Sequence, residues 1–362
     1  MKMFKNFFFL ALLLLQGFAF ASDIIVGTWN VKRLGHGEKQ NYEALAEIAQ
    51  RMDVIALQEV MSESGLGRLE KTLERRTGES WSTIASHAIG SSSYKEFYAF
   101  LWRDKAVEYD EGAVVYLDRG DRFIREPFSA QFKSKRDNSK LAIATVHILY
   151  GKGISDRKPE ILELSQYWTW FTGLYPEAEH MLVGDFNLEP NHAAWQSLKA
   201  YARPLVTSGA STLSSTNGHF ANLYDNIWVA KKSRLKIVSA GIINFPKILG
   251  FNHEVSRATV SDHAPIYLTL GNVSLNVSKG HTVESEPAAP SNKKAMPLPV
   301  SSELAPSTIS NFQSSVRGNK NSKIYHRPDC PSYNRIADKN RVEFDNAQQA
   351  IASGYRLAGN CR

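Results

Sequence analysis

Residues 180–187 read HMLVGDFN, a short apolar run that ends in Gly184, Asp185 and Asn187. An apolar run closed by Gly, Asp and Asn predicts a buried β-strand followed by a tight turn. The turn alone would explain the polar residues, because Asp and Asn side chains satisfy nearby backbone groups. The alternative is that the turn presents Asp185 and Asn187 to a ligand at the end of the strand.

Polar groups lie at the ends of apolar runs in both directions from this stretch. In chain order they are Asn30, Glu59, His147, Asp185 with Asn187, Asp225, and Asp262 with His263. Each has a structural explanation when taken alone, such as a hydrogen-bonded core histidine, a loop cap or an exposed acid. Their joint occurrence at strand ends favours a shared site on one rim of a sheet.

The body of the chain alternates two kinds of segment. Runs rich in β-branched and aromatic residues predict strands at 24–31, 54–57, 97–102, 141–147, 180–183, 227–230 and 265–270. Helical spacing of apolar residues predicts helices at 42–52, 66–76 and 158–174. Many strands with a few helices between them predict an α+β fold, in which helices cover sheets.

The N-terminus has the pattern of an export signal. Lys2 and Lys5 precede the apolar run 7–15, and Ala19 and Ala21 are small residues at the positions that a signal peptidase needs. A membrane anchor is less well supported, because about 14 apolar residues fall short of the ~20 that span a bilayer. We therefore expect a signal peptide at residues 1–21, cleaved after Ala21, and a secreted or periplasmic protein without a membrane anchor.

Composition and charge divide the remainder into three parts. Residues 22–272 carry equal numbers of basic and acidic residues, residues 273–310 form a neutral linker rich in Pro and Ser, and residues 311–362 carry nine basic and four acidic residues. The isoelectric point of about 9.2 would suggest a nucleic-acid binder, but this argument applies to the C-terminal module only. We expect a catalytic domain at 22–272, a linker and a small module.

The polar set resembles that of the endonuclease/exonuclease/phosphatase family, whose members cleave phosphate esters with a divalent metal. The resemblance covers about residues 24–270. The runs 93–96, 100–103 and 125–127, with Ser215, Thr216 and Asn217 ahead of Tyr224 and Asp225, look like the secreted deoxyribonuclease I branch. The resemblance implies a β-sandwich of two sheets flanked by helices.

The resemblance implies a metal site made of hard oxygen ligands. Glu59 is the first expected ligand, and Asn30 and Asp262 are its companions. Mg²⁺ suits an all-oxygen site with open water positions, and Mn²⁺ is the natural substitute. Asp185 would position water or bind a second metal, and Asn187 would donate a hydrogen bond to a phosphate oxygen.

Two imidazole–carboxylate pairs are implied beside this metal. His263 is the candidate general base, with Asp225 orienting its ring, and His147 is the matching acid or phosphate-side donor, with Glu96 as its partner. The sequence leaves open which of the two histidines is the base.

Contacts to DNA are implied at three positions. Arg125 would hold a backbone phosphate, or it would pair with Glu126 or Asp121. Tyr94 would lie along a groove of the duplex, or it would be a rim aromatic. Thr216 belongs to the substrate-binding set by the same resemblance.

These features predict a monomeric, divalent-metal-dependent endonuclease that cleaves DNA, with RNA as a possible second substrate, and has little sequence specificity. Another phosphoesterase of the family, such as a sphingomyelinase or an inositol-phosphate phosphatase, is the alternative enzyme. A binding protein that kept the fold and lost catalysis is the alternative class. It would have lost an acid or a histidine, whereas all the expected positions are filled.

Two features depart from the resembled proteins. The loop 208–212 has no acid, so a structural Ca²⁺ site there is doubtful. The C-terminal module resembles the zinc module of Ada-type repair proteins, but His326, Cys330, Ala358 and Cys361 stand at the four positions of its cysteines. Three possible ligands disfavour zinc. In an oxidising compartment we expect a Cys330–Cys361 disulfide instead.

Overall fold

A computed structural model describes residues 23–275, except 38, 93 and 217. Within residues 315–358 it describes all but 321–322, 329–332, 334–335, 337–339 and 346. The chain divides into two compact units, 1–285 and 286–362. The signal peptide, almost all of the linker, Cys330 and Cys361 lie outside the described residues. No helix in the described ranges is long and apolar enough to cross a membrane.

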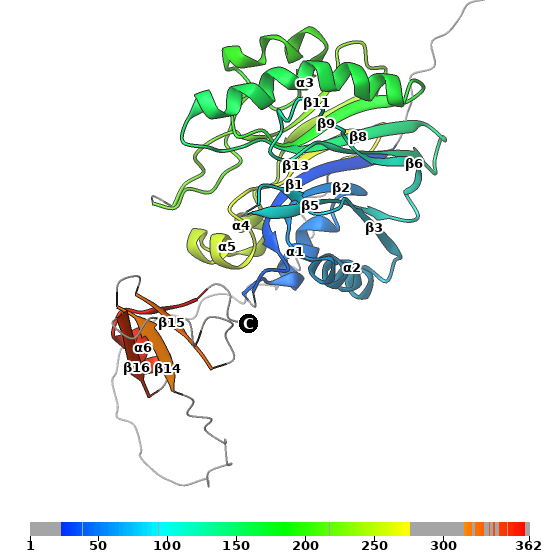
Figure 1. Cartoon of the computed structure of the whole chain (residues 1–362). Helices are drawn as coiled ribbons and strands as arrows, with labels where there is room; N and C mark the ends of the chain where they lie inside the picture. The colour runs from blue at the N-terminus through cyan, green and yellow to red at the C-terminus, as the bar shows by residue number, and fades with distance from the viewer. Residues whose placement is uncertain are drawn as a thin grey trace, which may run out of the picture. The chain divides into compact units, whose positions relative to one another are not determined.

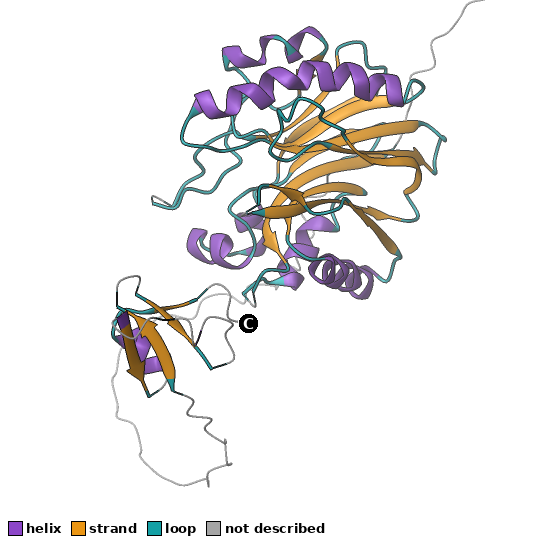
Figure 2. Cartoon of the chain, in the orientation of Figure 1, coloured by secondary structure: helices purple, strands orange, loops and turns teal. Residues whose placement is uncertain are grey.

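The larger unit contains two mixed sheets (Figures 1 and 2). The first has the order β12 (Ile237–Ile242), β13 (Ile266–Leu270), β1 (Ile24–Leu34), β2 (Val54–Val60), β5 (Lys95–Arg103) and β3 (Trp81–Ala85), and β4 (Ile89–Gly90) also pairs with β5. The second has the order β10 (Ala202–Pro204), β11 (Asp225–Ala230), β9 (Glu179–Asp185), β8 (Lys140–His147), β7 (Phe128–Ser134) and β6 (Val107–Val115).

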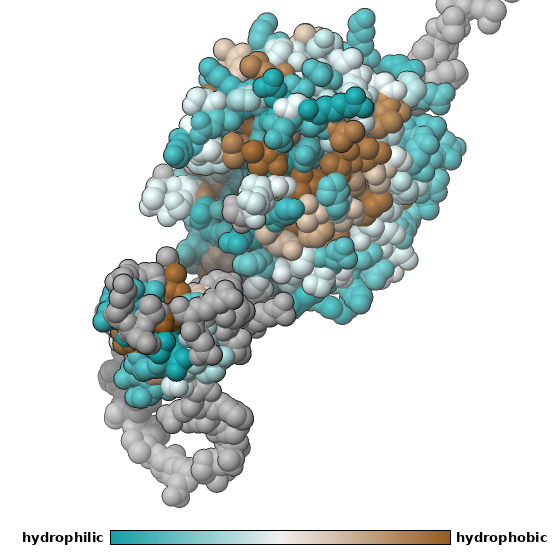
Figure 3. Space-filling view, viewed as in Figure 1, coloured by the Kyte–Doolittle hydropathy of each residue, from teal (hydrophilic) through white to brown (hydrophobic). Residues whose placement is uncertain are grey.

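Helices cover the outer faces of both sheets. A core between the sheets joins Val26 of β1 to Phe128 of β7 and Val183 of β9. On the first sheet, α1 (Tyr42–Ala49), α2 (Glu63–Thr77) and α4 (Phe245–Leu249) pack over a second core, and α5 (His253–Thr259) follows α4. On the second sheet, α3 (Ile154–Leu174) and the short helices η1 (Ala193–Gln196) and η2 (Leu198–Ala200) pack over a third. The fold is the two-sheet sandwich flanked by helices that the resemblance implies. In space-filling view, apolar residues gather in the middle of the face of this unit that is shown (Figure 3).

Strand pairing brings the polar strand ends together. β1 and β2 are parallel, with Asn30 opposite Gln58, and β8 and β9 are parallel, with His147 opposite Asp185. β11 runs antiparallel to β9 and places Asp225 on the other side of Asp185. Register alone therefore sets Asp185 between His147 and Asp225.

Gly184 makes the close pairing of β8 and β9 possible. Its φ is +137°, and a Cβ at this position would lie 2.0 Å from the carbonyl oxygen of Val146. Any larger residue would push the two strands apart directly before Asp185. The glycine of the HMLVGDFN stretch is thus required by the strand pairing as well as by the turn.

The predicted strands and helices are present, with different ends. β2 continues to Val60, so Glu59 lies within the strand and not after it. α1 ends at Ala49, and α3 begins at Ile154. The strands β3, β4, β6, β7, β10 and β12 and the helices α4 and α5 were not predicted. β6 lies at a sheet edge and carries exposed acids, so it lacks an apolar pattern.

The smaller unit contains a four-stranded sheet with the order β16 (Arg341–Phe344), β14 (Val316–Asn319), β15 (Ile324–His326) and β17 (Arg356–Leu357), together with α6 (Ala347–Ala352). Its core includes Phe344 and Tyr355, whose ring centroids are 4.9 Å apart. A Cβ on Gly318 would lie 2.7 Å from the Tyr355 ring. Ala358 is buried, and its amide donates to the carbonyl of Tyr325. The Cys330–Cys361 disulfide stays a prediction.

Candidate active site

Glu59 is turned into the site by an irregularity in β2. The register of β2 shifts between Leu57 and Val60 against β5, and Glu59 has a φ of +57°, which a non-glycine residue rarely adopts. The side-chain amide of Asn30 donates to Glu59 Oε1 at 3.1 Å and to Asp185 Oδ2 at 3.1 Å. One amide thus bridges two carboxylates that would otherwise repel each other.

His147 is held by Glu96 and by the backbone of its strand. Its Nδ1 donates to Glu96 Oε1 at 2.9 Å, and Glu96 is fully buried. The backbone amide of His147 donates to the hydroxyl of Tyr98 at 2.7 Å, and its carbonyl accepts from Arg125 Nε at 3.0 Å. Glu96 therefore fixes the imidazole through Nδ1, while Tyr98 and Arg125 fix the backbone that carries it.

His263 is held in the same way from the opposite side. Its Nδ1 donates to Asp225 Oδ2 at 2.8 Å, and the same oxygen accepts from the hydroxyl of Ser211 at 2.6 Å. The indole of Trp29 donates to the carbonyl of His263 at 2.7 Å. Each histidine is thus the middle member of a fixed imidazole–carboxylate pair.

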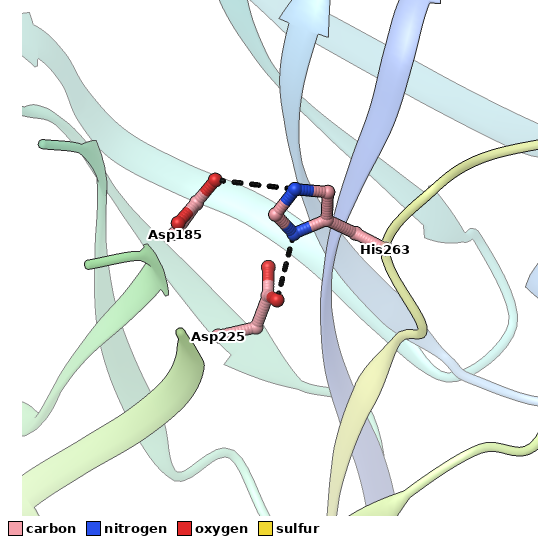
Figure 4. Close-up of side chains that lie close together, drawn as sticks. All are labelled: Asp185, Asp225 and His263. Carbon is pink, nitrogen blue, oxygen red and sulfur yellow. Dashed lines mark hydrogen bonds and ion pairs between the residues drawn. The ribbon is translucent and has the colours of Figure 1, made fainter. Parts of the chain in front are cut away.

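Asp185 lies between the two imidazoles. Its Oδ2 is 3.6 Å from Nε2 of His147 and 3.7 Å from Nε2 of His263. Figure 4 shows His263 between Asp185 and Asp225, with one ring nitrogen toward each. The Oδ1 of Asp185 accepts from the backbone amide of Asn187 at 3.0 Å. The free nitrogens of both imidazoles therefore converge on one carboxylate oxygen.

Electrostatics favour charged imidazoles at this site. Burial lowers the pKa of His263, but Asp225 and Asp185 outweigh burial and raise the pKa to about 10. Burial and Arg125 lower the pKa of His147, but Glu96 and Asp185 raise it overall. Burial raises the pKa of Asp185, yet the charges of His263 and His147 bring it below its usual value. The site is a compact set of paired opposite charges shielded from water.

Asp185, Asp225 and His263 could hold a metal ion, because each offers a ligand atom within 4.8 Å of the others. Asp225 Oδ1 is buried without a hydrogen-bond partner, which is favourable for a cation. Glu59 and Asp185 form a second possible set, bridged by the amide nitrogen of Asn30, whose oxygen accepts from the backbone amide of Lys32 at 3.0 Å. Asp185 belongs to both sets.

Tyr94 and Arg125, which the sequence predicts to contact DNA, both lie near Glu96. The structure places Tyr94 near Glu59 and Glu96, where burial and these two acids raise the pKa of its hydroxyl. Arg125 is buried, and its Nε is 3.9 Å from Glu96 Oε2. Its ion pair is therefore with Glu96, and not with Glu126 or Asp121, the two partners considered from the sequence.

Asp262 and Thr216 do not join the central cluster. Asp262 forms ion pairs with Lys32 at 3.7 Å and Arg257 at 3.3 Å. Thr216 is exposed on the loop 213–220, whose base pairs with the backbone of His263 through Thr212. Asn187 is buried with a φ of +48°, and its side-chain amide donates to the carbonyl of Ile148 at 2.8 Å.

Several supporting residues were not among the predicted site residues. Tyr98 and Ser211 contact the imidazole–carboxylate pairs, and Glu160 of α3 accepts from the amides of Ile124 and Leu149 at 3.0 and 2.9 Å. Glu160 thereby ties the segment that carries Arg125 to the end of β8. The spacing of Glu96 and Tyr98 is the one sequence pattern that could have revealed Tyr98, because residues two apart on a strand lie on the same face.

Family models match both units of the chain. Residues 27–263 match the Endonuclease/Exonuclease/phosphatase family, and residues 310–362 match the metal binding domain of Ada. A deoxyribonuclease of Thioalkalivibrio sp. (strain K90mix) is 46% identical over 272 residues, which cover 73% of this chain and 75% of that protein. Deoxyribonuclease-1 of Canis lupus familiaris is 29% identical and covers 71% of this chain and 94% of its own length.

Solved structures share the fold of the larger unit. An endonuclease/exonuclease/phosphatase family protein of Bacteroides thetaiotaomicron aligns with a TM-score of 0.53 at 16% identity, over 68% of this chain and 97% of that one. A mannosyl-6-phosphatase from the same species aligns with a TM-score of 0.52, also at 16% identity, over 68% of this chain and 99% of that one. At this identity the likeness concerns the fold alone.

Proposed function

This chain belongs to the endonuclease/exonuclease/phosphatase family, a family of hydrolases, and on that premise we propose that it is a divalent-metal-dependent endonuclease that hydrolyses DNA with little sequence specificity. The observation that carries the proposal is the convergence of His147 Nε2 and His263 Nε2 on Asp185 Oδ2. Two imidazoles at one point suit a reaction in which one proton is removed and another is delivered. In-line hydrolysis of a phosphodiester is such a reaction.

The two histidines stabilise charge and transfer protons. Protonated imidazoles offset the negative charge of a phosphodiester, which otherwise repels a nucleophile. The raised pKa of His263 favours a proton donor in the free enzyme. The base has to be neutral at the moment when it accepts the proton of water. Glu96 and Asp225 fix the tautomers, so each free Nε2 points toward the reacting phosphate.

The residues at the site fit a divalent cation. We assign the ligands to Glu59 and Asp185, because using Asp225 and His263 would break the 2.8 Å pair that orients the imidazole. Asn30 would join them through its amide oxygen only after its side chain turns over, because that oxygen accepts from the backbone amide of Lys32 at 3.0 Å. Hard oxygen donors favour Mg²⁺, with Mn²⁺ as a substitute. When bound, such an ion supplies positive charge to the phosphate and to the leaving oxygen. Asp262 is a more distant candidate, because Lys32 and Arg257 already pair with it.

DNA is the proposed substrate for two reasons. The two curated relatives described above are both named deoxyribonucleases. Arg125 and Tyr94 lie near Glu96, the partner of His147, which supports contacts of both with the DNA backbone beside the reacting phosphate. We further propose that the protein is secreted or periplasmic, which the pattern of residues 1–21 supports.

A substrate panel tests this function. Purified full-length protein is incubated with supercoiled plasmid, single-stranded DNA, RNA and sphingomyelin, each with Mg²⁺ and with excess EDTA. We expect nicking of the plasmid with Mg²⁺ and none with EDTA. Hydrolysis of sphingomyelin without cleavage of DNA would overturn the substrate, and undiminished cleavage in EDTA would overturn the metal.

A further inference from the structure

Arg157, near the start of α3, is a buried guanidinium without an acidic partner among the described residues. The residue is 6% exposed, and it takes part in no ion pair with the described residues. Its Nε donates to the carbonyl of Tyr150 at 2.8 Å, and an Nη atom donates to the carbonyl of Asn187. Burying an unpaired charge is costly, so such a group points to a functional role.

Two tyrosine rings lie against this guanidinium. Its central carbon is 4.4 Å from the ring centroid of Tyr150 and 5.6 Å from that of Tyr224. The two ring centroids are 6.4 Å apart. Tyr150 is 57% exposed, although Arg157 contacts both its ring and its carbonyl. An exposed aromatic ring that is held in place loses little entropy when a flat ligand stacks on it.

The cluster lies directly beside the catalytic residues. Tyr150 follows His147 by three residues, and Tyr224 immediately precedes Asp225. The carbonyl of Tyr224 accepts from the amide of Phe186 at 2.8 Å. Arg157 thereby joins the loops that follow β8 and β9 to the segment that precedes β11. Each of these three segments adjoins one residue of the proposed catalytic set, namely His147, Asp185 or Asp225.

We propose that Tyr150 and Arg157 form a nucleoside-binding subsite next to the reacting phosphate. The exposed ring of Tyr150 stacks on a base of the substrate strand. Arg157 is a positioning residue that holds this ring and the backbone of Asn187. The inference rests on the proposed function, because it assigns a nucleotide substrate to the same site.

The chemistry of this subsite predicts its selectivity. Every base has an aromatic face, so stacking on Tyr150 is tolerant of sequence. A base inside an intact duplex is already stacked on its neighbours and has to leave them first. The subsite therefore favours single-stranded or frayed DNA over intact duplex.

The test uses oligonucleotides with one unmodified phosphodiester among phosphorothioate linkages. One oligonucleotide carries all its bases, and two others carry an abasic site on the 5′ or the 3′ side of the unmodified linkage. For the wild-type enzyme, KM on one of the two abasic substrates should be at least about fivefold higher than on the complete oligonucleotide. A change of about fivefold is the lower end of the effect of removing one stacked base. This arm needs no variant, and an unchanged KM on both abasic substrates would overturn the proposal.

Variants of Tyr150 identify the ring. Tyr150→Ala should raise KM at least about fivefold on the complete oligonucleotide, with no added effect on the abasic substrate that weakens binding to the wild type. Tyr150→Phe keeps the ring and should restore tight binding. A Phe variant as weak as the Ala variant, or an equal loss on all three substrates, would overturn stacking. Tyr201→Ala is the matched control, because Tyr201 is 47% exposed and lies beyond the far end of β11 from Asp225.

Arg157→Lys tests the positioning role. Lysine keeps the charge but cannot reach both carbonyls with a planar fork, so kcat should fall and KM should rise on the complete oligonucleotide. On the abasic substrate only the fall in kcat should remain. Wild-type values of both parameters would overturn the role of Arg157. Failure of the wild type to cleave any DNA would instead overturn the proposed function, so the two failures are distinguishable.

Discussion

At the scale of single residues, the chemistry of the site depends on three carboxylates that have two different tasks. Glu96 and Asp225 fix the two imidazoles through Nδ1, and Asp185 faces both Nε2 atoms. Asp185 is also bridged to Glu59 by Asn30. Because Asp185 contacts both histidines and the proposed metal site, it couples proton transfer to metal binding.

Glu59→Gln tests the metal site. The substitution keeps the size of the side chain but removes its charge, so the variant should lose at least about tenfold in Mg²⁺-dependent cleavage and need more Mg²⁺ to reach half its maximal rate. Glu63→Gln, at an exposed position in the first turn of α2, is the control and should behave like the wild type. An unchanged Mg²⁺ dependence for Glu59→Gln would assign the ion to Asp185, Asp225 and His263.

The raised pKa of His263 predicts a pH dependence of stability. The pKa is about 10 in the folded protein, against 6.5 for an unperturbed histidine side chain, so between these values the folded state binds one more proton than the unfolded state. The contribution of His263 to the free energy of unfolding should therefore be fully present below pH 6.5 and fall by up to about 1.4 kcal/mol per pH unit toward pH 10. Denaturation in EDTA at several pH values measures this slope. His263→Gln should reduce it, and an equal slope would contradict the assignment.

At the scale of elements, two parallel strand pairs carry the site. Polar residues at the ends of apolar runs predicted this convergence from sequence, because register places His147, Asp185 and Asp225 side by side. The inward turn of Glu59 was not predictable, since it depends on a register shift between three strands. The pairing of Asp262 with Lys32 and Arg257 was not predictable either, because those residues are distant in sequence or lie on α5.

Gly184→Ala tests the contribution of the β8–β9 pairing. A Cβ would lie 2.0 Å from the carbonyl of Val146, and the φ of +137° is unfavourable for alanine. We expect a loss of at least about 2 kcal/mol in the free energy of unfolding, together with reduced cleavage because Asp185 follows directly. Chemical denaturation and initial rates measure both effects.

Gly173→Ala is the control for this substitution. Gly173 is exposed within α3, and a methyl group at this position would have nothing within 4 Å of it outside its own stretch of helix. Alanine should stabilise the helix by up to about 1 kcal/mol and leave the rate unchanged. A Gly184→Ala protein as stable and active as Gly173→Ala would show that β8 and β9 do not need the close contact.

At the scale of the whole molecule, the catalytic unit and the basic C-terminal module are separate in sequence and charge. All proposed catalytic residues precede Leu275, which packs against the core under α1 and α2. The module matches the metal binding domain of Ada, yet Ala358 offers no ligand atom at one of the expected positions. Its nine basic and four acidic residues leave attraction to DNA as its simplest physical property.

A protein that ends after Leu275 tests this division of roles. It should fold and cleave short DNA at the wild-type rate. Its affinity for long DNA should fall at low salt, and the difference from the full-length protein should shrink as salt screens the charges. Binding is measured in EDTA, where cleavage is prevented. Equal affinities at low salt would leave the module without a role in binding DNA.

The nicking rate of supercoiled plasmid by His147→Ala, His263→Ala and the double variant tests the central claim that both imidazoles act on one phosphate. Each single variant should lose ~10²-fold or more, and the double variant should lose less than the product of the two. Retained binding of plasmid in EDTA would show that the loss is chemical. A wild-type rate for either single variant, or fully multiplicative losses, would contradict the claim.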